Sequence, residues 1–445
     1  MPVRKPLHRQ RDHVIYVEGG QPLNGRICIS GAKNASLPLM AASLLTEEPV
    51  RLSNVPEVAD TDLLRDIIHQ LGGRTRALAD GSLSIVARRI GSEVPENLGR
   101  RMRASIVLLG ALLSRTGAAR LPKPGGDEIG ARRVEQHIRG LRAMGAEIDE
   151  TATDFVARAR RLHGARVLFD LPTVTGTENI ILAAVMAEGR TEIFNAAREP
   201  HVQDLSRFLI KMGAQIHGIG TDQLVIEGVP RLHGAEHHVI PDYLEAGTYA
   251  IAVAATGGDV LLECSPPEDL RQVLLKLEEA GVDIEVGEGE FRVRRPRRTH
   301  LRPVDMGTWV HPGFPTDLQA QYLALMTQAH GESVISEYLF ENRYQHVPEL
   351  MRMGARIRVD GRTCFVHGPS ELHGTDVVVP DIRSGAALVI AALCARGVTE
   401  LHHAWHVDRG YQDLVGKLSE LGARIERRKP RHDRAGAPTT DKSYE

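Results

Sequence analysis

Cysteine is scarce in this chain of 445 residues, whose four cysteines are Cys28, Cys264, Cys364 and Cys394. They lie far apart and form no C-x-x-C pair, so the pattern suggests neither a disulfide framework nor a zinc site. We expect all four to be small core residues. Long apolar runs are also missing. No uncharged stretch approaches the roughly 20 residues that span a bilayer, and no apolar segment of signal-peptide length follows the N-terminus. We therefore expect a cytoplasmic protein with no membrane partner.

The chain also lacks a strong charge of one sign. It holds 55 lysines and arginines against 57 aspartates and glutamates, for a formal net charge of -2, which disfavours a generic nucleic-acid binder. No Walker loop, H-E-x-x-H, G-x-S-x-G or Rossmann fingerprint occurs in the sequence. Nucleotide hydrolysis, zinc proteolysis and hydride transfer therefore have no local support.

One phrase occurs six times along the chain: an amphipathic run, a glycine, and then a strand-like segment. Leucines at helical spacing before a glycine are typical of a helix that ends in a left-handed cap, and alternating residues after it indicate a strand. The six glycines follow one another at intervals of 73, 68, 68, 73 and 68 residues; they are Gly72, Gly145, Gly213, Gly281, Gly354 and Gly422.

A second phrase lies between these, an almost wholly apolar helical run. Five copies are followed by a glycine, and a sixth, near residue 40, has none; the glycines are Gly117, Gly189, Gly257, Gly331 and Gly397. Helices that are apolar on every side belong inside a core. Six units of about 70 residues divide most naturally as three plus three into two α/β domains. The basic N-terminal dozen residues and the tail from residue 428 lack apolar content, and we expect both to be mobile.

Two segments place ionisable residues beside turns. In SGAKNASLP, Lys33 and Asn34 stand at the start of the first apolar helix, where backbone amides favour an anion. From spacing alone, a surface lysine beside an Asn cap is the better interpretation. In LPKPGGDEIGARRVEQH, the flexible loop from Pro124 to Gly130 carries Asp127 and Glu128, and Arg132 and Arg133 follow. Such a loop suits an active-site lid over a phosphorylated ligand, or is a solvated surface loop.

Further charged residues stand at segment junctions. Asp317 follows the Pro-rich turn of HPGFPTDLQAQ and by itself would be an ordinary helix cap. An arginine next to small residues and buried helices suits capture of a phosphate or carboxylate, although each alone could be an ion-pair partner. The arginines in this position are Arg103, Arg198, Arg343, Arg383 and Arg409.

These segments together carry a family resemblance. The motifs SGAKNA, MRASI, PGG-x-x-IGAR, TVTGTENI, NAAREP, LEAGT, PGFPTDLQAQ, FENRYQHVPELMRMGA, DIRSGA and HVDRGY occur in the right order across nearly all of residues 15 to 427. On them the chain resembles the UDP-N-acetylglucosamine 1-carboxyvinyltransferases of the EPSP synthase superfamily. The resemblance implies two inside-out α/β barrels, each of three pseudo-threefold-related repeats. We expect one discontinuous domain of residues 1–33 plus 242–427, an inserted domain of residues 34–241, and a tail of residues 428–445.

The resemblance also implies an activity. The family transfers the enolpyruvyl group of phosphoenolpyruvate to the 3'-hydroxyl of UDP-N-acetylglucosamine, through a tetrahedral intermediate and with release of phosphate. This is the first committed step of peptidoglycan synthesis, and it needs no metal, cofactor or protein partner. Two alternatives stay open: transfer to another uridine nucleotide in antibiotic biosynthesis, and a non-catalytic protein that binds a nucleotide sugar. A shikimate-phosphate acceptor is disfavoured, because the PGG loop and PGFPTDLQAQ belong to the nucleotide-sugar branch.

By the same resemblance, residues acquire roles. Lys33, Arg132 and Arg409 would hold phosphoenolpyruvate, with Arg103 and Arg383 close by, and Asn34 would contact the sugar-bound intermediate. Asp317 would act as general base, and Arg343 would enter the cleft from the other domain. Arg132, Arg133, Val134, Glu135 and Gln136 match the stretch that holds uracil, and Thr173, Val174, Thr175 and Gly176 match the turn near the diphosphate.

The chain departs from the family pattern at two places. Asp127 stands where much of the family has a cysteine that takes part in protonation of the phosphoenolpyruvate methylene and that fosfomycin alkylates, so we expect insensitivity to the drug. An aspartate can act as general acid there only if its pKa rises from about 3.9 toward neutrality, and we expect the neighbouring carboxylate of Glu128 to contribute to such a rise. Arg133, Glu135, Gln136 and Leu171 also differ from common family residues, which leaves the acceptor nucleotide open.

Overall fold

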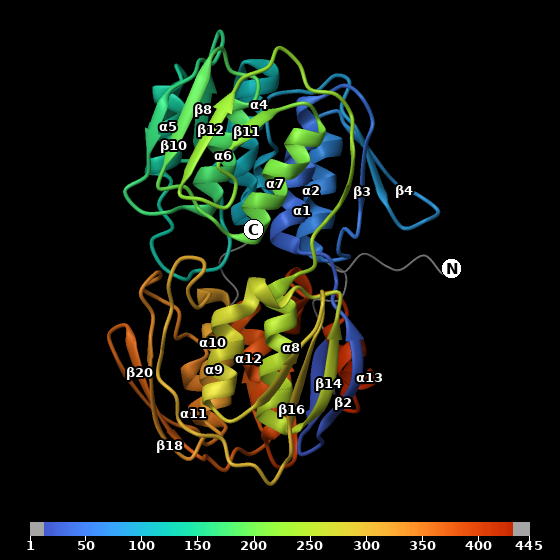
Figure 1. Ribbon diagram of the computed structural model, residues 1–445, viewed down its shortest axis with the longest axis vertical. Coiled ribbons are helices and arrows are strands. Elements are labelled where there is room, and N and C mark those ends of the chain that lie inside the picture. The colour runs from blue at the N-terminus through green and yellow to red at the C-terminus, as the bar shows by residue number, and fades with distance from the viewer. Residues whose placement is uncertain (1–12, 430–445) are drawn as a thin grey trace.

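Two separate hydrophobic cores organise residues 13–429, the part of the chain that the computed structural model describes. One core takes residues from Ile15 to Ile29 and again from Tyr243 to Ile425. The other is built from the intervening chain, between Ala32 and Val239. We call them the terminal body and the inserted body; Figure 1 shows the terminal body below and the inserted body above. We propose that these bodies are the two domains expected from the repeats.

Each body encloses apolar helices behind amphipathic helices and three sheets. In the inserted body the helices are α1 (Lys33–Ala42), α2 (Ala59–Gln70), α3 (Glu96–Gly99), α4 (Leu108–Thr116), α5 (Glu135–Ala143), α6 (Val174–Ala184) and α7 (Pro200–Lys211). In the terminal body they are α8 (Tyr243–Thr256), α9 (Arg271–Glu279), α10 (Gln319–Met326), α11 (Val347–Arg352), α12 (Ile382–Cys394) and α13 (Leu414–Glu420). Every residue of α8 and α10 is buried, because most of their side chains are apolar and both helices lie at the centre of the terminal body.

The three sheets of the inserted body have the strand orders β13-β3-β5-β4, β6-β8-β7 and β11-β12-β10-β9. Their strands are β3 (Val50–Ser53), β4 (Arg74–Ala77), β5 (Leu83–Val86), β6 (Ala118–Pro122), β7 (Glu147–Glu150), β8 (Asp154–Arg158), β9 (Arg166–Leu168), β10 (Arg190–Phe194), β11 (Gln215–His217), β12 (Gln223–Glu227) and β13 (Glu236–His238).

The sheets of the terminal body have the orders β15-β16-β14-β2, β17-β18-β20-β19 and β21-β22-β1-β23. Their strands are β1 (Val14–Glu18), β2 (Leu23–Cys28), β14 (Gly258–Glu263), β15 (Asp283–Val286), β16 (Phe291–Arg295), β17 (Met306–Gly307), β18 (Gly331–Ser336), β19 (Arg356–Asp360), β20 (Thr363–Gly368), β21 (Asp376–Val378), β22 (Val398–His402) and β23 (Arg424–Arg428). All five four-stranded sheets combine one parallel pair with two antiparallel pairs, which is the signature of a repeated unit.

The repeated glycines have the backbone that the sequence predicts. All six glycines of the first phrase have φ between +91° and +106°, directly after the last turn of an amphipathic helix. A Cβ is disfavoured in this left-handed conformation, so glycine ends each helix and turns the chain into the next strand. The mixed α/β fold in two three-sheet bodies confirms the expected fold class.

Two expectations at the surface need correction. Cys364 is buried and Cys394 is partly buried, but Cys28 and Cys264 are exposed, because both stand at strand ends. The expected mobile tail also begins too early, since Arg428 pairs with Val14 in the sheet formed by β1 and β23.

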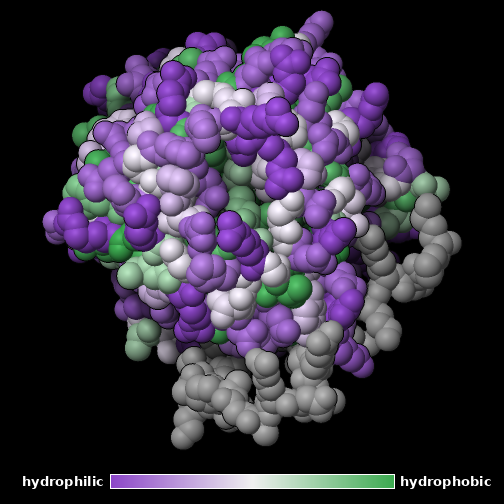
Figure 2. All heavy atoms as spheres, turned by 90° about the horizontal axis from the view of Figure 1, so that it is seen from below, coloured by the Kyte–Doolittle hydropathy of each residue, from purple (hydrophilic) through white to green (hydrophobic). Residues whose placement is uncertain are grey.

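Residues 1–12 and 430–445 lie outside the described part. Within residues 13–429 every helix is too short or too polar to cross a bilayer. The surface seen from below is mostly hydrophilic with scattered apolar residues (Figure 2).

Candidate active site

The chain crosses between the two bodies twice, and one carboxylate joins the crossings. Gly31 pairs with Pro241 in an isolated antiparallel bridge. The side chain of Asp242 accepts hydrogen bonds from the backbone N–H groups of Lys33 at 3.2 Å, Leu244 at 2.9 Å and Glu245 at 3.1 Å. Asp242 thereby caps α1 of the inserted body and α8 of the terminal body together. The expected cap at Asn34 is wrong, because α1 already begins at Lys33.

Lys33 is not a surface lysine. It is only 8% exposed, and its Nζ lies 2.8 Å from Oδ2 of Asp60 in the first turn of α2. Arg409 approaches the other oxygen of Asp60, with Nε 3.2 Å from Oδ1. Burial alone would raise the pKa of Asp60, but the charges of Lys33 and Arg409 outweigh it and lower that pKa. Asp60 is therefore a buried carboxylate shared by two cations, one from each body.

Arg409 also reaches the loop that carries Asp127. Its Nη1 lies 2.5 Å from Oδ1 of Asp127, so one guanidinium of the terminal body holds two carboxylates of the inserted body. Burial would raise the pKa of Asp127, yet Arg409 and Lys33 together lower it below the ordinary value. The condition for a general acid at this position, a raised pKa, is therefore not met in this structure. Glu128 is exposed beside it, and its contact to the terminal body is made by its backbone carbonyl rather than by its carboxylate.

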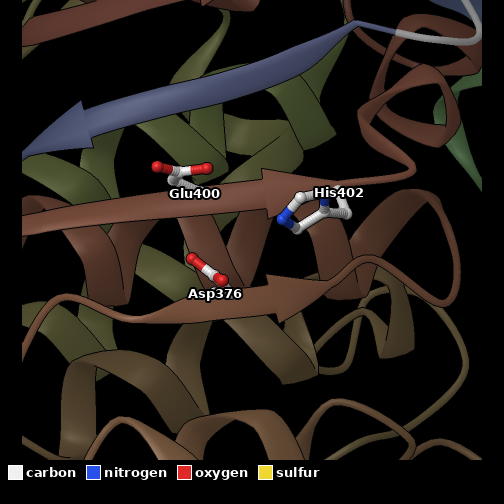
Figure 3. Close-up of side chains that lie close together, drawn as sticks. All are labelled: Asp376, Glu400 and His402. Carbon is white, nitrogen blue, oxygen red and sulfur yellow. The ribbon is translucent and has the colours of Figure 1, made fainter. Parts of the chain in front are cut away.

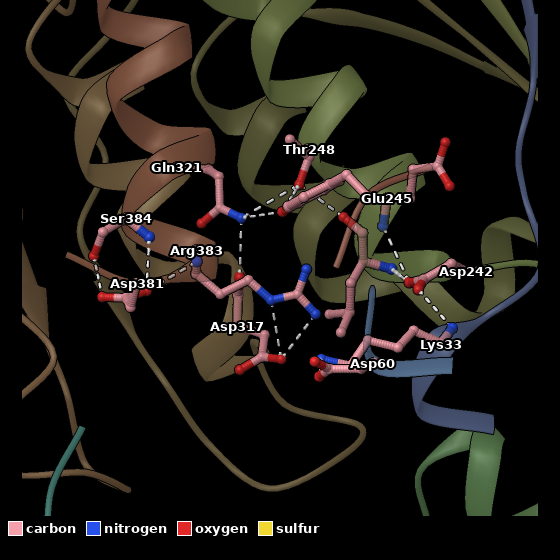
Figure 4. A network of polar contacts seen from close by, with 12 residues as sticks. Lys33, Asp60, Asp242, Glu245, Thr248, Asp317, Gln321, Asp381, Arg383 and Ser384 are labelled. Carbon is pink, nitrogen blue, oxygen red and sulfur yellow. Dashed lines mark hydrogen bonds and ion pairs between the residues drawn. The ribbon is translucent and has the colours of Figure 1, made fainter. Parts of the chain in front are cut away.

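Asp317 lies between two arginines of its own body. Nη2 of Arg343 is 2.5 Å from Oδ1 of Asp317, while Nε and Nη2 of Arg383 lie 3.2 Å and 3.1 Å from Oδ2. Figure 4 shows the guanidinium of Arg383 aimed at Asp317, with Lys33 reaching toward Asp60 beside them. Although burial favours protonation, Arg383 and Arg343 hold the pKa of Asp317 well below its usual range. Asp317 is thus ionised, and it is more than the helix cap that spacing alone indicates.

Two further carboxylates, which sequence reasoning missed, position this group. Asp381 caps α12 through the N–H groups of Arg383 and Ser384, at 2.9 Å and 3.0 Å, and so holds Arg383 at the helix start. Glu337 accepts hydrogen bonds from the hydroxyls of Thr308 at 2.8 Å and Thr316 at 2.9 Å. Glu337 also accepts backbone N–H groups of Leu339 and Phe340. It therefore ties the turn before Asp317 to the segment that leads to Arg343.

Arg132 faces both ion-pair groups without joining either. Within residues 13–429 its guanidinium has no ion pair or hydrogen bond, while Asp127, Asp317, Arg343 and Arg409 all act on its charge. Arg103 donates a hydrogen bond to the backbone carbonyl of Arg132. Cations outnumber carboxylates in these ion-pair groups once Arg132 is included, and the nearby Asp242 also acts on the charge of Arg383; the groups hold the five cations Lys33, Arg132, Arg343, Arg383 and Arg409 and the three carboxylates Asp60, Asp127 and Asp317. A space of this kind attracts an anion.

The Pro124–Gly130 loop rests on the terminal body. The backbone carbonyl of Glu128 accepts hydrogen bonds from Asn342 at 2.8 Å and Gln345 at 2.7 Å, and Glu341 accepts the N–H of Ala131 at 3.1 Å. Gly130 has φ +137°, and a Cβ there would collide with Glu341. The loop, which carries Asp127, is therefore packed against the terminal body and is not a freely solvated loop.

The stretch from Arg133 to Gln136 starts α5 and lies beside the segment that precedes α6. Arg133 and Glu135 are exposed, and Val134 is the residue before the helix. The Gln136 amide is fully engaged with that segment: its oxygen accepts the N–H of Asp170 at 2.6 Å and its nitrogen donates to the carbonyl of Leu171 at 3.1 Å.

The first turn of α6 offers backbone N–H groups. Thr173 caps α6 by accepting the N–H of Gly176, and the hydroxyl of Thr175 lies 3.4 Å from Nε2 of the buried His137. Asn34, by contrast, is partly buried and makes no side-chain hydrogen bond within residues 13–429. The structure thus brings Lys33, Asp127, Asp317, Arg132, Arg343, Arg383 and Arg409 together, and the residues at α5 and α6 line a neighbouring stretch of the inserted body.

Three potential metal ligands gather elsewhere. Asp376 on β21 and Glu400 and His402 on β22 bring their ligand atoms within 4.8 Å of one another (Figure 3). Asp376 is exposed and the other two are partly exposed. The group lies on two neighbouring strands of the sheet β21-β22-β1-β23 in the terminal body, and we assign it no part in the chemistry of the buried charges.

Comparison with known proteins agrees with this fold. The family model described as EPSP synthase (3-phosphoshikimate 1-carboxyvinyltransferase) matches residues 17–418. The enolpyruvyl transferase NikO from Streptomyces tendae is 28% identical, with a TM-score of 0.84 over 94% of this chain and 100% of that one. Two structures of EPSP synthase from Acinetobacter baumannii are 18% and 19% identical, with TM-scores of 0.72 and 0.70 over 94% and 93% of this chain and 100% and 99% of theirs.

These matches identify the class of protein as a transferase built from two α/β bodies. The chain belongs to the EPSP synthase family, whose model covers it almost from end to end.

Proposed function

We propose that this transferase moves the enolpyruvyl group of phosphoenolpyruvate to the 3'-hydroxyl of UDP-N-acetylglucosamine and releases phosphate. The observation that carries the proposal is the set of five cations from both bodies around three carboxylates, with Arg132 unpaired. Phosphoenolpyruvate supplies a phosphate and a carboxylate at neighbouring atoms, and its charge matches such a group of cations. We place the reaction in the cytoplasm, as the first committed step of peptidoglycan synthesis.

In the proposed complex, Arg132, Lys33 and Arg409 bind the phosphate and carboxylate of phosphoenolpyruvate. Among the described residues Arg132 has no ion-pair partner, whereas Lys33 and Arg409 share Asp60 and Asp127 with the incoming anion. Arginine presents two parallel N–H groups to such an anion, which orients it as well as attracts it. Arg103 supports this arrangement by holding the backbone of Arg132.

Asp317 is the proposed general base. It takes the proton of the acceptor hydroxyl as that oxygen bonds to C2 of phosphoenolpyruvate, while C3 gains a proton to form the tetrahedral intermediate. Loss of phosphate from C2 and of a proton from C3 then restores the double bond in the product. Arg343 and Arg383 keep Asp317 ionised but also make it a weak base, so proton transfer to Asp317 requires that the bound anionic substrate offset the charge of these arginines.

In this scheme, substrate binding raises the pKa of Asp127, so that its carboxyl group holds the proton it later donates. Burial raises its pKa, and only the charges of Arg409 and Lys33 reverse that effect. When the phosphate and carboxylate of phosphoenolpyruvate neutralise these cations, burial acts alone and favours the protonated carboxyl group. Asp127 then donates a proton to C3 in place of the cysteine found in much of the family. The closed loop keeps water away from this transfer.

The acceptor is proposed to lie along the inserted body. Backbone N–H groups at the start of α6, from Thr173 to Gly176, suit a diphosphate, because a helix N-terminus favours negative charge. Asn34 has an uncommitted amide for the sugar-bound intermediate. The Arg132 to Gln136 stretch is left for uracil.

One observation favours a second candidate, transfer to another uridine nucleotide. Gln136 spends its amide on the backbone of Asp170 and Leu171, and the Leu171 side chain is 72% exposed. A base bound there would meet a different surface from that of most family members. The structural match to NikO, which is described as an enolpyruvyl transferase, is compatible with either acceptor.

The deciding experiment measures phosphate release from phosphoenolpyruvate with UDP-N-acetylglucosamine, UMP or shikimate 3-phosphate as acceptor. Release with the UDP-sugar alone supports the first proposal, and release with UMP alone supports the second. Release with shikimate 3-phosphate alone would contradict both. Absence of release with every acceptor, in protein that still binds the UDP-sugar, would favour the non-catalytic binding protein.

A further inference from the structure

One backbone geometry recurs within this chain directly after four strands. These strands are each followed by a non-glycine residue in the left-handed conformation, with φ between +56° and +59°; the residues are Asn54, Asn195, Cys264 and His403. Asparagine is among the few residues that adopt this conformation readily, and cysteine has no such preference. Cys264 therefore occupies a position whose backbone does not favour it.

The two asparagines show what this position does. Nδ2 of Asn54 donates to the carbonyl of Val239 at 2.9 Å, and Nδ2 of Asn195 donates to the carbonyl of Phe169 at 2.9 Å. Val239 directly follows β13 and Phe169 directly follows β9, the parallel neighbours of the two core strands. In each case the side chain of the left-handed residue forms a hydrogen bond with the backbone at the end of the adjacent parallel strand.

At the third position sulfur takes the place of the amide. Strands β14 and β2 are parallel, with Glu263 opposite Cys28, so Cys264 comes next to the end of β2. Sγ of Cys264 lies 2.8 Å from Sγ of Cys28, and both residues are exposed. The contact between the ends of these two strands is therefore made by a pair of thiols that solvent can reach.

We propose that Cys28 and Cys264 are a reversible thiol–disulfide site that reacts with small-molecule disulfides of the glutathione class. The Cys264 thiolate attacks the disulfide, forms a mixed disulfide and releases one thiol. The Cys28 sulfur then attacks Cys264, forms the intramolecular bond and releases the second thiol. The protein loses two electrons and two protons, and the small disulfide gains them. Partial burial of its sulfur and the neighbouring Cys264 raise the pKa of Cys28 to about 11, which makes Cys28 the slower first nucleophile.

The disulfide bond would join the two segments of the terminal body from which the inserted body begins and ends. Cys28 lies just before the chain crosses at Gly31, and Cys264 ends the first strand after the chain returns at Pro241. The pair is 236 positions apart in the sequence, so the closed loop contains the entire inserted body. Lys417 binds the carbonyl of Cys28 at 3.2 Å and the hydroxyl of Ser30 at 2.6 Å, which already orders the approach to the crossing.

The test incubates the full chain with oxidised or reduced glutathione and counts thiols by alkylation and intact mass. We expect free thiols to fall from four to two, a loss of about 2 Da, and a linked peptide pair containing Cys28 and Cys264. Cys364 is buried and Cys394 partly buried, and they serve as internal controls that stay reduced. Linkage through either control cysteine, stable glutathionylation without linkage, or four unchanged thiols would overturn the proposal.

Two variants and a cleavage assay sharpen the result. Cys264→Asn restores the amide found at Asn54 and Asn195, so it should fold, keep its transferase activity and form no internal bond. Cys28→Ser leaves Cys264 alone and should stop at the mixed disulfide. Proteolysis within the Pro124–Gly130 loop separates the two cysteines onto different fragments. On a non-reducing denaturing gel these fragments should stay together only after oxidation of the unmodified chain, and their separation there would contradict the bond.

Discussion

Arg409 and Asp127 join the two bodies of this protein directly, with Nη1 of the arginine 2.5 Å from Oδ1 of the aspartate. The same guanidinium binds Asp60 through Nε. One side chain therefore contributes both to the contact between the bodies and to the charge of the loop carboxylate. An anion that competes for Arg409 changes both together, which connects substrate binding to the acidity of Asp127.

Replacement of that side chain by lysine should weaken phosphoenolpyruvate binding. In Arg409→Lys a single ammonium replaces a planar fork that reaches two carboxylates at once. We expect KM for phosphoenolpyruvate to rise about 10-fold or more, from a loss of about 1.4 kcal/mol or more of binding. Steady-state kinetics check this. Arg424→Lys, which changes an exposed arginine paired with Glu18, is the matched control and should behave as the unmodified protein. Equal KM values in the two variants would remove Arg409 from the proposed anion site.

Asp317→Asn should abolish most turnover without unfolding the protein. The amide keeps the shape of the carboxylate but cannot accept a proton, so we expect kcat to fall by about 10²- to 10⁴-fold. Rapid-quench measurement of phosphate release tests the chemical step, and a thermal melt verifies that the fold persists. Asp360→Asn provides a control at an exposed carboxylate of the same body. Turnover within a few-fold of the unmodified protein would exclude a base at Asp317.

Exchange of the loop carboxylate for a thiol should restore drug sensitivity. Fosfomycin has no thiol to alkylate at Asp127, and we expect the unmodified enzyme to retain its activity in the drug. In Asp127→Cys, Arg409 and Lys33 stabilise a thiolate at the same place, so covalent inactivation should follow. Mass spectrometry locates the adduct. Inactivation of the unmodified enzyme, or alkylation of another cysteine in the variant, would count against this assignment.

A buried histidine should make the fold sensitive to mild acid. Burial lowers the pKa of His137 to about 3, below the value of about 6.5 in an unfolded chain. Between these values the unfolded state binds a proton that the folded state does not, so stability falls as pH falls and is fully present above pH 6.5 or so. This group should cost about 2 kcal/mol between pH 7 and pH 5. Urea unfolding of His137→Gln should show a shallower pH dependence, whereas His217→Gln, at an exposed position, should keep the original slope.

Loosening the loop contact should expose the loop to proteases. Glu341→Ala removes the acceptor of the Ala131 N–H and an exposed ion pair with Arg362, while it leaves the buried ion-pair groups intact. We expect faster cleavage within the Pro124–Gly130 loop, partial protection by UDP-N-acetylglucosamine, and a lower kcat/KM. Glu371→Ala changes an exposed glutamate of the same body and supplies the control. Cleavage rates that match this control would show that the contact does not hold the loop closed.

The elements that could be predicted from the sequence are those whose cause is local. Each of the six repeated glycines, the first Gly72 and the last Gly422, ends a helix because glycine adopts the left-handed backbone easily. Each apolar helix is buried because it has no polar face. Lys33, Asp317 and the junction arginines were found because they interrupt that repeat. Asp60 was missed because an acidic residue in the first turn of a helix is ordinary, and nothing nearby in the sequence marks its contact with Arg409, 349 positions away.

The amino-acid sequence by itself determined the repeated unit, the buried helices and the kinds of charge available to the site, because spacing and side-chain chemistry need no neighbours. Only the tertiary structure decided which charges meet. It ionised Asp127, since Arg409 and Lys33 outweigh its burial, and it brought the exposed thiols of Cys28 and Cys264 together across a parallel strand pair. Interaction energies between charges depend on distance and burial, and these two quantities exist only after the chain has folded.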